Sequence, residues 1–200
     1  MRRVIFLFVL CALVLSCVNQ PRSVKGNEST HIEKYIDDFR SRFPKGLDND
    51  AQREKMNVAF KTEIKDSLSN DPLFLADYPI KCKSVLNNPK DSSSCYVHFQ
   101  SWIHPDNFSF KNMNLNEVGF DIVASVPVRY IDLLKENEFY CIKGRLIDFI
   151  SYEIFETFTN DMAYTASVGI SPEVGVSGWF NVNLGMMLFE IDNIEPYSKN

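Results

Sequence analysis

The chain has 200 residues, of which 45% are hydrophobic, and it carries 21 basic against 26 acidic side chains, a net charge of −5 at neutral pH. This acidic balance disfavours nucleic acid and anionic lipid headgroups as partners, because both bind to positively charged surfaces.

The first sixteen residues have the pattern of an export signal. Arg2 and Arg3 form a positive start, and an unbroken apolar run follows, VIFLFVLCALVL, residues 4–15. This run is too short to cross a bilayer, which takes about 20 apolar residues. Its length and flanks are those of a secretory signal peptide. We therefore expect residues 1–16 to be removed from the mature protein.

The end of this leader resembles the bacterial lipobox, in which a peptidase cuts before a cysteine that has received a diacylglyceryl group. The residues that carry the resemblance are Val14, Leu15, Ser16 and Cys17. The resemblance implies a lipoprotein of the cell envelope, held to a membrane by a lipid on Cys17. Residues 17–29 are polar after the cysteine, and we expect them to form a flexible tether. The alternative is an ordinary secreted protein that is cleaved elsewhere.

Loss of the leader makes the mature chain more acidic, since 19 of the 21 basic side chains then remain against 26 acidic ones.

Three cysteines lie beyond the tether: Cys82, Cys95 and Cys141. Cys82 and Cys95 flank a polar turn and could be bridged across a hairpin in an oxidising compartment, or could stay reduced. Cys141 is expected to be a buried free thiol.

Residues 30–71 are predicted to form two amphipathic helices. Thr30 and Glu33 have the spacing of a capping box. An apolar stripe with helical periodicity follows, and Pro44 and Gly46 end it. A second helix is expected from Asn49 or Asp50 to about Asp71. The stripes consist of Ile32, Tyr35, Ile36, Phe39 and Phe43, and of Met56, Ala59, Phe60, Ile64 and Leu68.

Residues 72–197 are predicted to form a mainly β domain, because the hydrophobic period changes to two. A proline-initiated helical stretch from Pro127 separates the third and fourth strands. Gly144 predicts a bend or bulge within the fourth strand. A long connection, 151–178, precedes the last strand. The expected strands span residues 73–86, 95–103, 118–126, 139–149 and 180–194.

Two segments of this domain resemble exported OB-fold domains, which are common among lipoproteins of gut-type bacteria and similar to the anticodon-binding OB module. They are LKENEFYCIKGRLIDF, residues 134–149, and LFEIDNIEPY, residues 188–197. The resemblance implies a mainly β (α+β) fold: a five-stranded Greek-key barrel with a helix between strands three and four, preceded by the helical pair. The alternative is another small β-barrel or α+β sheet.

Aromatic residues cluster in two predicted connections. If these loops border the ligand face of an OB barrel, the rings are candidate ligand-facing side chains. The alternative is that Ile154, Phe155 and Phe158 cap the barrel mouth as core, and the same alternative applies to the aromatic group around Trp102 and Phe108. The candidates are Trp102, Phe108, Tyr152, Phe155, Phe158 and Tyr164.

No catalytic, metal or cofactor motif is recognised. His98 and His104 would stand about 20 Å apart on one strand, too far to share a metal ion. Residues 175–178, GVSG, lack the spacing of a nucleophile elbow and are expected to form a glycine-containing loop. We expect a non-enzymatic module that binds an envelope protein, a glycan or a small ligand. The alternatives are an envelope hydrolase using Asp148, Glu153, Glu156 or Asp161, and a nucleic-acid-binding OB domain, which the charge disfavours.

Overall fold

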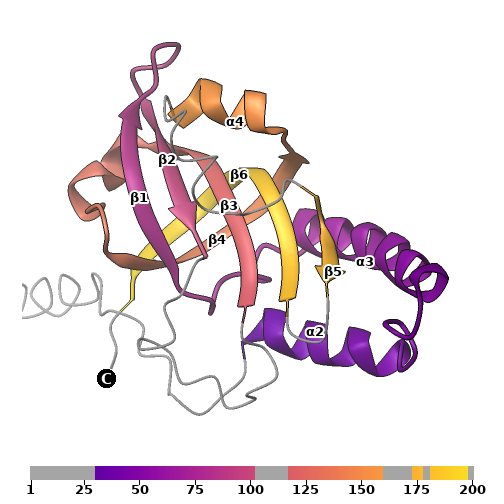
Figure 1. The fold of residues 1–200 in the computed structure, drawn as a ribbon. Helices are drawn as coiled ribbons and strands as arrows, with labels where there is room; N and C mark the ends of the chain where they lie inside the picture. The colour runs from indigo at the N-terminus through magenta and orange to yellow at the C-terminus, as the bar shows by residue number, and fades with distance from the viewer. Residues whose placement is uncertain (1–29, 102–116, 160–172, 178–180, 198–200) are drawn as a thin grey trace, which may run out of the picture.

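The computed structural model describes residues 30–101, 117–159, 173–177 and 181–197. The predicted leader, Cys17 and the tether lie outside these ranges. Within them the chain has a mixed α+β fold in which a six-stranded sheet closes partly into a ring and two long helices cover one side (Figure 1).

The two predicted N-terminal helices are present as α2 (His31–Arg42) and α3 (Asp50–Asn70). The capping box is formed: Thr30 accepts a hydrogen bond from the Glu33 backbone, and the Glu33 carboxylate accepts one from the Thr30 backbone. Each helix buries the predicted stripe, with Tyr35, Phe43 and Ala59 partly buried at its margins. Neither these helices nor any other described helix is both long and apolar enough to cross a membrane.

The sheet is built from six strands that are not all neighbours in sequence. Their order is β3-β2-β1-β4-β6-β5, and β3 also pairs with β6, which closes the ring. The β3–β6 pairing is parallel, and every other pairing is antiparallel. The strands are β1 (Ile80–Asn87), β2 (Ser94–Gln100), β3 (Glu117–Pro127), β4 (Phe139–Phe149), β5 (Gly175–Ser177) and β6 (Asn181–Pro196).

The prediction was wrong at the start of the first strand. Residues 73–78 form consecutive turns, and the strand begins only at Ile80, after Pro79. Phe74, Leu75 and Tyr78 are nevertheless buried, so these turns carry apolar side chains into the core. Their composition therefore resembled that of a buried strand. The second strand ends at Gln100 in the described residues, and Ile103 lies outside them.

The fourth strand has the predicted bounds, and Gly144 lies at a shift in its register with β6. A Cβ atom at Gly144 would overlap the carbonyl oxygen of Glu190 and lie 3.0 Å from the Cα of Ile191. The prediction of a bulge at Gly144 is therefore confirmed. The physical reason is the close approach of two backbones.

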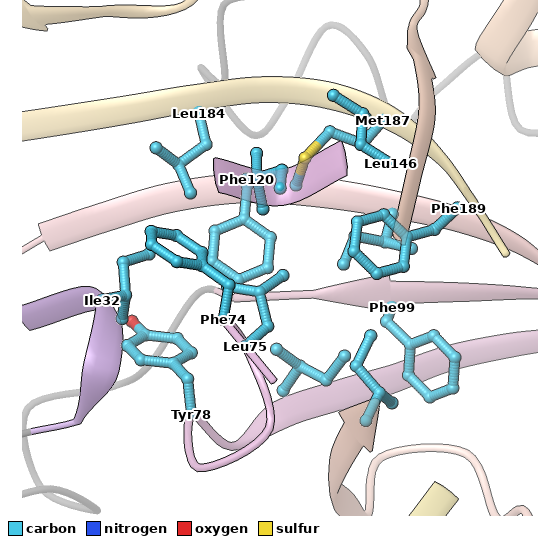
Figure 2. Close-up of a cluster of buried hydrophobic side chains, with 14 of the residues drawn as sticks. Ile32, Phe74, Leu75, Tyr78, Phe99, Phe120, Leu146, Leu184, Met187 and Phe189 are labelled. Carbon is cyan, nitrogen blue, oxygen red and sulfur yellow. The ribbon is translucent and has the colours of Figure 1, made fainter. Parts of the chain in front are cut away.

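The main core fills the ring and extends to the helical pair. Phe99, Phe120 and Phe189 point inward from three strands, and Ile32 of α2 and Tyr78 of the turns lie against them (Figure 2). The rings of Tyr78 and Phe120 are 5.7 Å apart. The helices thus cover one side of the ring of strands and share one hydrophobic core with it.

The connection between β3 and β4 contains a short 3-10 helix, η2 (Val128–Leu133), that starts directly after Pro127, as predicted. Its end is held by Tyr140, whose hydroxyl donates to the Leu133 carbonyl and accepts from the Lys135 backbone. A side chain of β4 therefore fixes the path by which the chain returns to the sheet.

Of the two possibilities left open for Cys82 and Cys95, a bridge or reduced thiols, the structure has the reduced thiols. Both residues are buried free thiols, as is Cys141. The hairpin register pairs Cys82 with Phe99 and Cys95 with Asn87, so the two cysteines do not oppose each other. Because Asn87 pairs with Cys95, Cys82 lies five residues further from the turn than the partner of Cys95 does.

Helix α3 also protects the short strand β5. The Val176 backbone N–H donates a hydrogen bond of 2.8 Å to Oδ1 of Asn57, which lies on α3. An edge strand otherwise presents unpaired backbone groups to other chains. Here the side chain of Asn57 on α3 accepts a hydrogen bond from one of these backbone groups, the N–H of Val176.

Candidate functional site

A second, smaller cluster of buried side chains lies on the outer face of the sheet. It consists of Val123, Ile150, Phe155 and Met186, with Tyr152, Phe158 and Leu188 partly buried around it. Helix α4 (Tyr152–Thr159) supplies its cover. Figure 1 shows α4 at the end of the molecule that is remote from α2 and α3.

The presence of α4 corrects the prediction of an irregular connection over 151–178. The described parts of this segment are a helix and the strand β5. Residues 175–177, predicted as a loop, pair with β6 instead. The remaining residues of the segment, 160–172 and Gly178, lie outside the described ranges.

The side chains beneath α4 are ordered in cross-strand rows. Along β2, Tyr96, His98 and Gln100 alternate with the inward-pointing residues, so they share the outer face. The antiparallel register sets these three opposite Ser125, Val123 and Asp121 of β3, respectively. On the other side of β3, Asp121 pairs with Met186 and Val123 with Leu188 of β6.

A polar pair lies in the middle of this face. The Nε2 atom of His98 and the Oδ1 atom of Asp121 are 2.7 Å apart, and the side chains are 5% and 1% exposed. They are diagonal neighbours, two positions apart in register, which is within reach of long side chains. Withdrawing such groups from water is costly, and their mutual hydrogen bond offsets part of that cost.

Helix α4 places one aromatic ring over each part of these rows. The Phe158 ring lies 4.9 Å from that of Tyr96, and the Phe155 ring lies edge-on to His98, also at 4.9 Å. One turn earlier, burial raises the pKa of the Tyr152 phenol and the negative charge of Asp121 raises it further. The helix therefore runs along β2, with Tyr152 at the end of the face where Asp121 and Gln100 lie.

Gln100 completes the polar group. Its side chain is 5% exposed, yet within the described part of the chain its Nε2 atom has no hydrogen-bond partner. A buried donor left without an acceptor costs about 1–3 kcal/mol, so such groups are rare in native proteins. The outer face thus holds a donor that no other described residue of the protein uses.

The structure separates the six aromatic candidates. Phe155 is completely buried, so it acts as core and is not a ligand-facing side chain in this structure. Tyr152 and Phe158 are partly buried, whereas Ile154, expected to be core if the rings cap the barrel, is 47% exposed. Trp102, Phe108 and Tyr164 lie outside the described residues.

The carboxylates considered for hydrolysis are dispersed where they are described. Asp148 lies 3.6 Å from Lys65 in an exposed ion pair, and Glu153 is exposed on the first turn of α4. The side chain of Glu156 and residue Asp161 lie outside the described part. His104 does too, and within the described residues no group of three or more metal-ligating side chains is placed to hold a metal ion.

Sequence analysis missed His98, Asp121 and Gln100 as a group. The alternation along the two strands did place them on the face opposite to the core. Nothing in that pattern shows that a helix covers this face, so the three residues resembled ordinary solvated side chains.

Comparison with protein-family models, with curated proteins and with solved structures found no match to this chain.

Proposed function

We propose that this protein is a lipid-anchored module of the cell envelope that binds a partner through an OB-type barrel and catalyses no reaction. Support for the fold comes from the ring order β1-β2-β3-β6-β4, with a short helix between β3 and β4. A five-stranded Greek-key barrel of OB type has its strands and its helix in these places, and its second and third strands form the ligand face. β2 and β3 are the strands that carry the polar rows.

The observation that carries the proposal is the buried polar group on the outer face of β2 and β3. A face that served only to seat α4 would be more stable with apolar side chains, because a buried polar pair is often no better than a hydrophobic replacement. His98, Asp121 and Gln100 lie there instead. Perturbed and buried polar groups gather at functional sites, so this face is the best candidate for binding.

The position of α4 fits a membrane anchor at the other end of the chain. Cys17 precedes Thr30, the N-cap of α2, by thirteen residues. Because α4 lies at the end remote from α2 (Figure 1), an anchor leading into α2 through a flexible tether leaves α4 and the face beneath it free to meet a partner.

The anchor is tested by mass spectrometry and fractionation of the full chain produced in bacteria. We expect a mature N-terminus at Cys17 that carries fatty acyl mass. Cys17→Ala should release the protein from the membrane, and the matched control Cys11→Ala should leave it bound. An unprocessed N-terminus, or acyl mass absent from Cys17, contradicts the anchor.

The binding end is tested with a photo-crosslinking amino acid placed at one of two exposed apolar positions. Ile154 is on α4 and Val58 on α3, 47% and 61% exposed. Irradiation of cells should give a discrete adduct from position 154 and none from position 58. Equal adducts from both positions, or turnover of an envelope substrate by the purified protein, would contradict the proposed function.

A further inference from the structure

The unused donor of Gln100 stands beside an acceptor. Gln100 and Asp121 are direct partners in the β2–β3 register. The Cβ atoms of such partners lie about 4.5–5.5 Å apart, with their side chains parallel. An amide N–H donor and a carboxylate acceptor are therefore offered together, at a spacing that one small polar group can span.

The charge of this face excludes an anionic ligand. Of the described side chains in the two rows that contain His98 and Gln100, His98 alone can carry a positive charge, and Asp121 is already bonded to it. The whole chain is acidic, with a net charge of −5. An anion brought beside Asp121 would be repelled without a compensating cation. The ligand group is therefore not an anion, and it must also accept from Gln100, which an ammonium or guanidinium group cannot do.

Tyr152 connects this position with the surface. Its ring packs against the cluster that contains Met186, which is the β6 partner of Asp121, and its side chain is only partly buried. An aromatic ring at the border of a polar site offers an apolar surface with a polar edge. A ligand with apolar C–H groups beside its hydroxyls can use both the ring and the polar pair.

Resting on the proposed function, we infer that Gln100, Asp121 and Tyr152 form a subsite for a neutral, hydroxyl-bearing glycan. A sugar hydroxyl both donates and accepts, so one hydroxyl, or two adjacent ones, can accept from Gln100 Nε2 and donate to Asp121. A peptide carbonyl would satisfy Gln100 but leave Asp121 facing another acceptor. The glycan therefore fits both groups.

The test is a titration of the full chain, purified in detergent, with neutral oligosaccharides: chitotetraose, xylotetraose, mannotetraose and maltotetraose. Side-chain amide resonances are followed by ¹⁵N NMR; the chain has only three glutamines, at positions 20, 52 and 100. At least one oligosaccharide should shift the Gln100 amide signals at concentrations that leave those of Gln52 unchanged.

Two variants of Gln100 test whether its side-chain amide is the group that binds the glycan. Gln100→Leu and Gln100→Glu should each weaken glycan binding by about tenfold or more, the effect of losing one well-placed hydrogen bond. The matched control Gln52→Leu changes an exposed glutamine of α3 and should bind as the unaltered chain does. Because Gln100→Leu removes an unsatisfied donor, it should fold at least as stably as the unaltered chain, which thermal unfolding verifies.

The inference is overturned if no neutral glycan shifts the Gln100 amide, if Gln100→Leu binds as tightly as the control, or if only an acidic oligosaccharide such as tetragalacturonate binds. These results leave the proposed function standing when position 154 still crosslinks to a partner. Loss of the Cys17 anchor or of the position-154 adduct, by contrast, bears on the proposed function and not on glycan binding.

Discussion

His98 and Asp121 share a hydrogen bond of 2.7 Å between two neighbouring strands, and both side chains are buried. Removing one partner leaves the other buried without it. We expect Asp121→Leu or His98→Leu to lower the free energy of unfolding by about 3 kcal/mol. The double variant should recover much of that loss, because neither a lone imidazole nor a lone carboxylate then remains buried at this position.

Chemical denaturation of the two single variants and the double variant measures this coupling. A double variant whose loss equals the sum of the two single losses would contradict it, because the two side chains would then act independently.

Gly144 is required by the close approach of β4 and β6. Gly144→Ala places a methyl group against the backbone of Glu190 and Ile191, which cannot yield as a flexible side chain would. We expect a loss of about 1–3 kcal/mol or more. Gly119→Ala is the matched control, because among the described residues its Cβ would meet only Asn183 Oδ1, at 3.8 Å. Thermal unfolding should therefore separate the two variants; similar melting temperatures would contradict the argument.

The hydrogen bond from Val176 to Asn57 holds β5 against α3. Asn57→Ala should raise the hydrogen-exchange rate of the Val176 amide about fivefold, the effect of losing about 1 kcal/mol of protection. Exchange in β3 should be unchanged. Asn70→Ala, at the far end of the same helix, serves as control, since its side chain bonds only the Asp66 carbonyl among the described residues. Equal effects of the two variants would show that the contact does not protect the strand.

The buried thiol of Cys82 should make the free energy of unfolding decrease at alkaline pH. Burial raises the pKa of its thiol from 9.0 to about 12, and the nearby acidic Glu136 and the thiol of Cys95 add to the effect. A group whose pKa is higher in the folded state stabilises the fold fully below its unfolded pKa and loses that contribution as the pH rises through its folded pKa. Stability should therefore fall between pH 9 and about pH 12.

Urea unfolding at several pH values tests this dependence, with Cys82→Ala as the comparison. The variant should lose less stability over the same interval, since the thiol is gone while the other titrating groups remain. Parallel curves for the two proteins would exclude Cys82 as a contributor.

Much of the fold could be predicted because local signals agreed with the packing. Thr30 and Glu33 mark a helix start by their own hydrogen bonds, and the alternation from Val118 to Val126 identifies a strand that is buried on one face. The turns over 73–78 were mistaken for a strand because their apolar side chains enter the core without regular backbone pairing. The apolar composition of a segment thus predicted that its side chains are buried, but it did not predict whether the backbone forms a strand or turns.

The candidate site was harder to predict, because it depends on what covers a sheet. The spacing of Tyr152, Phe155 and Phe158 at every third residue is a helical signal, and it could have revealed α4. The position of α4 over His98 and Asp121 could not be inferred, because it depends on contacts between segments more than 30 residues apart. The alternation of residues along β2 and β3 predicted which side chains share the outer face of the sheet. It did not predict that α4 packs on that face.

The strand that completes the ring is the last of the described strands in chain order. β6 supplies partners for β3, β4 and β5, so the ring cannot form until β6 is in place. Pairings between distant segments form late, since the entropy of loop closure is lost before the contacts are gained. Closure of the ring therefore waits for segments that are far apart in sequence to meet, and this chain should fold more slowly than a protein of the same size with mostly local contacts.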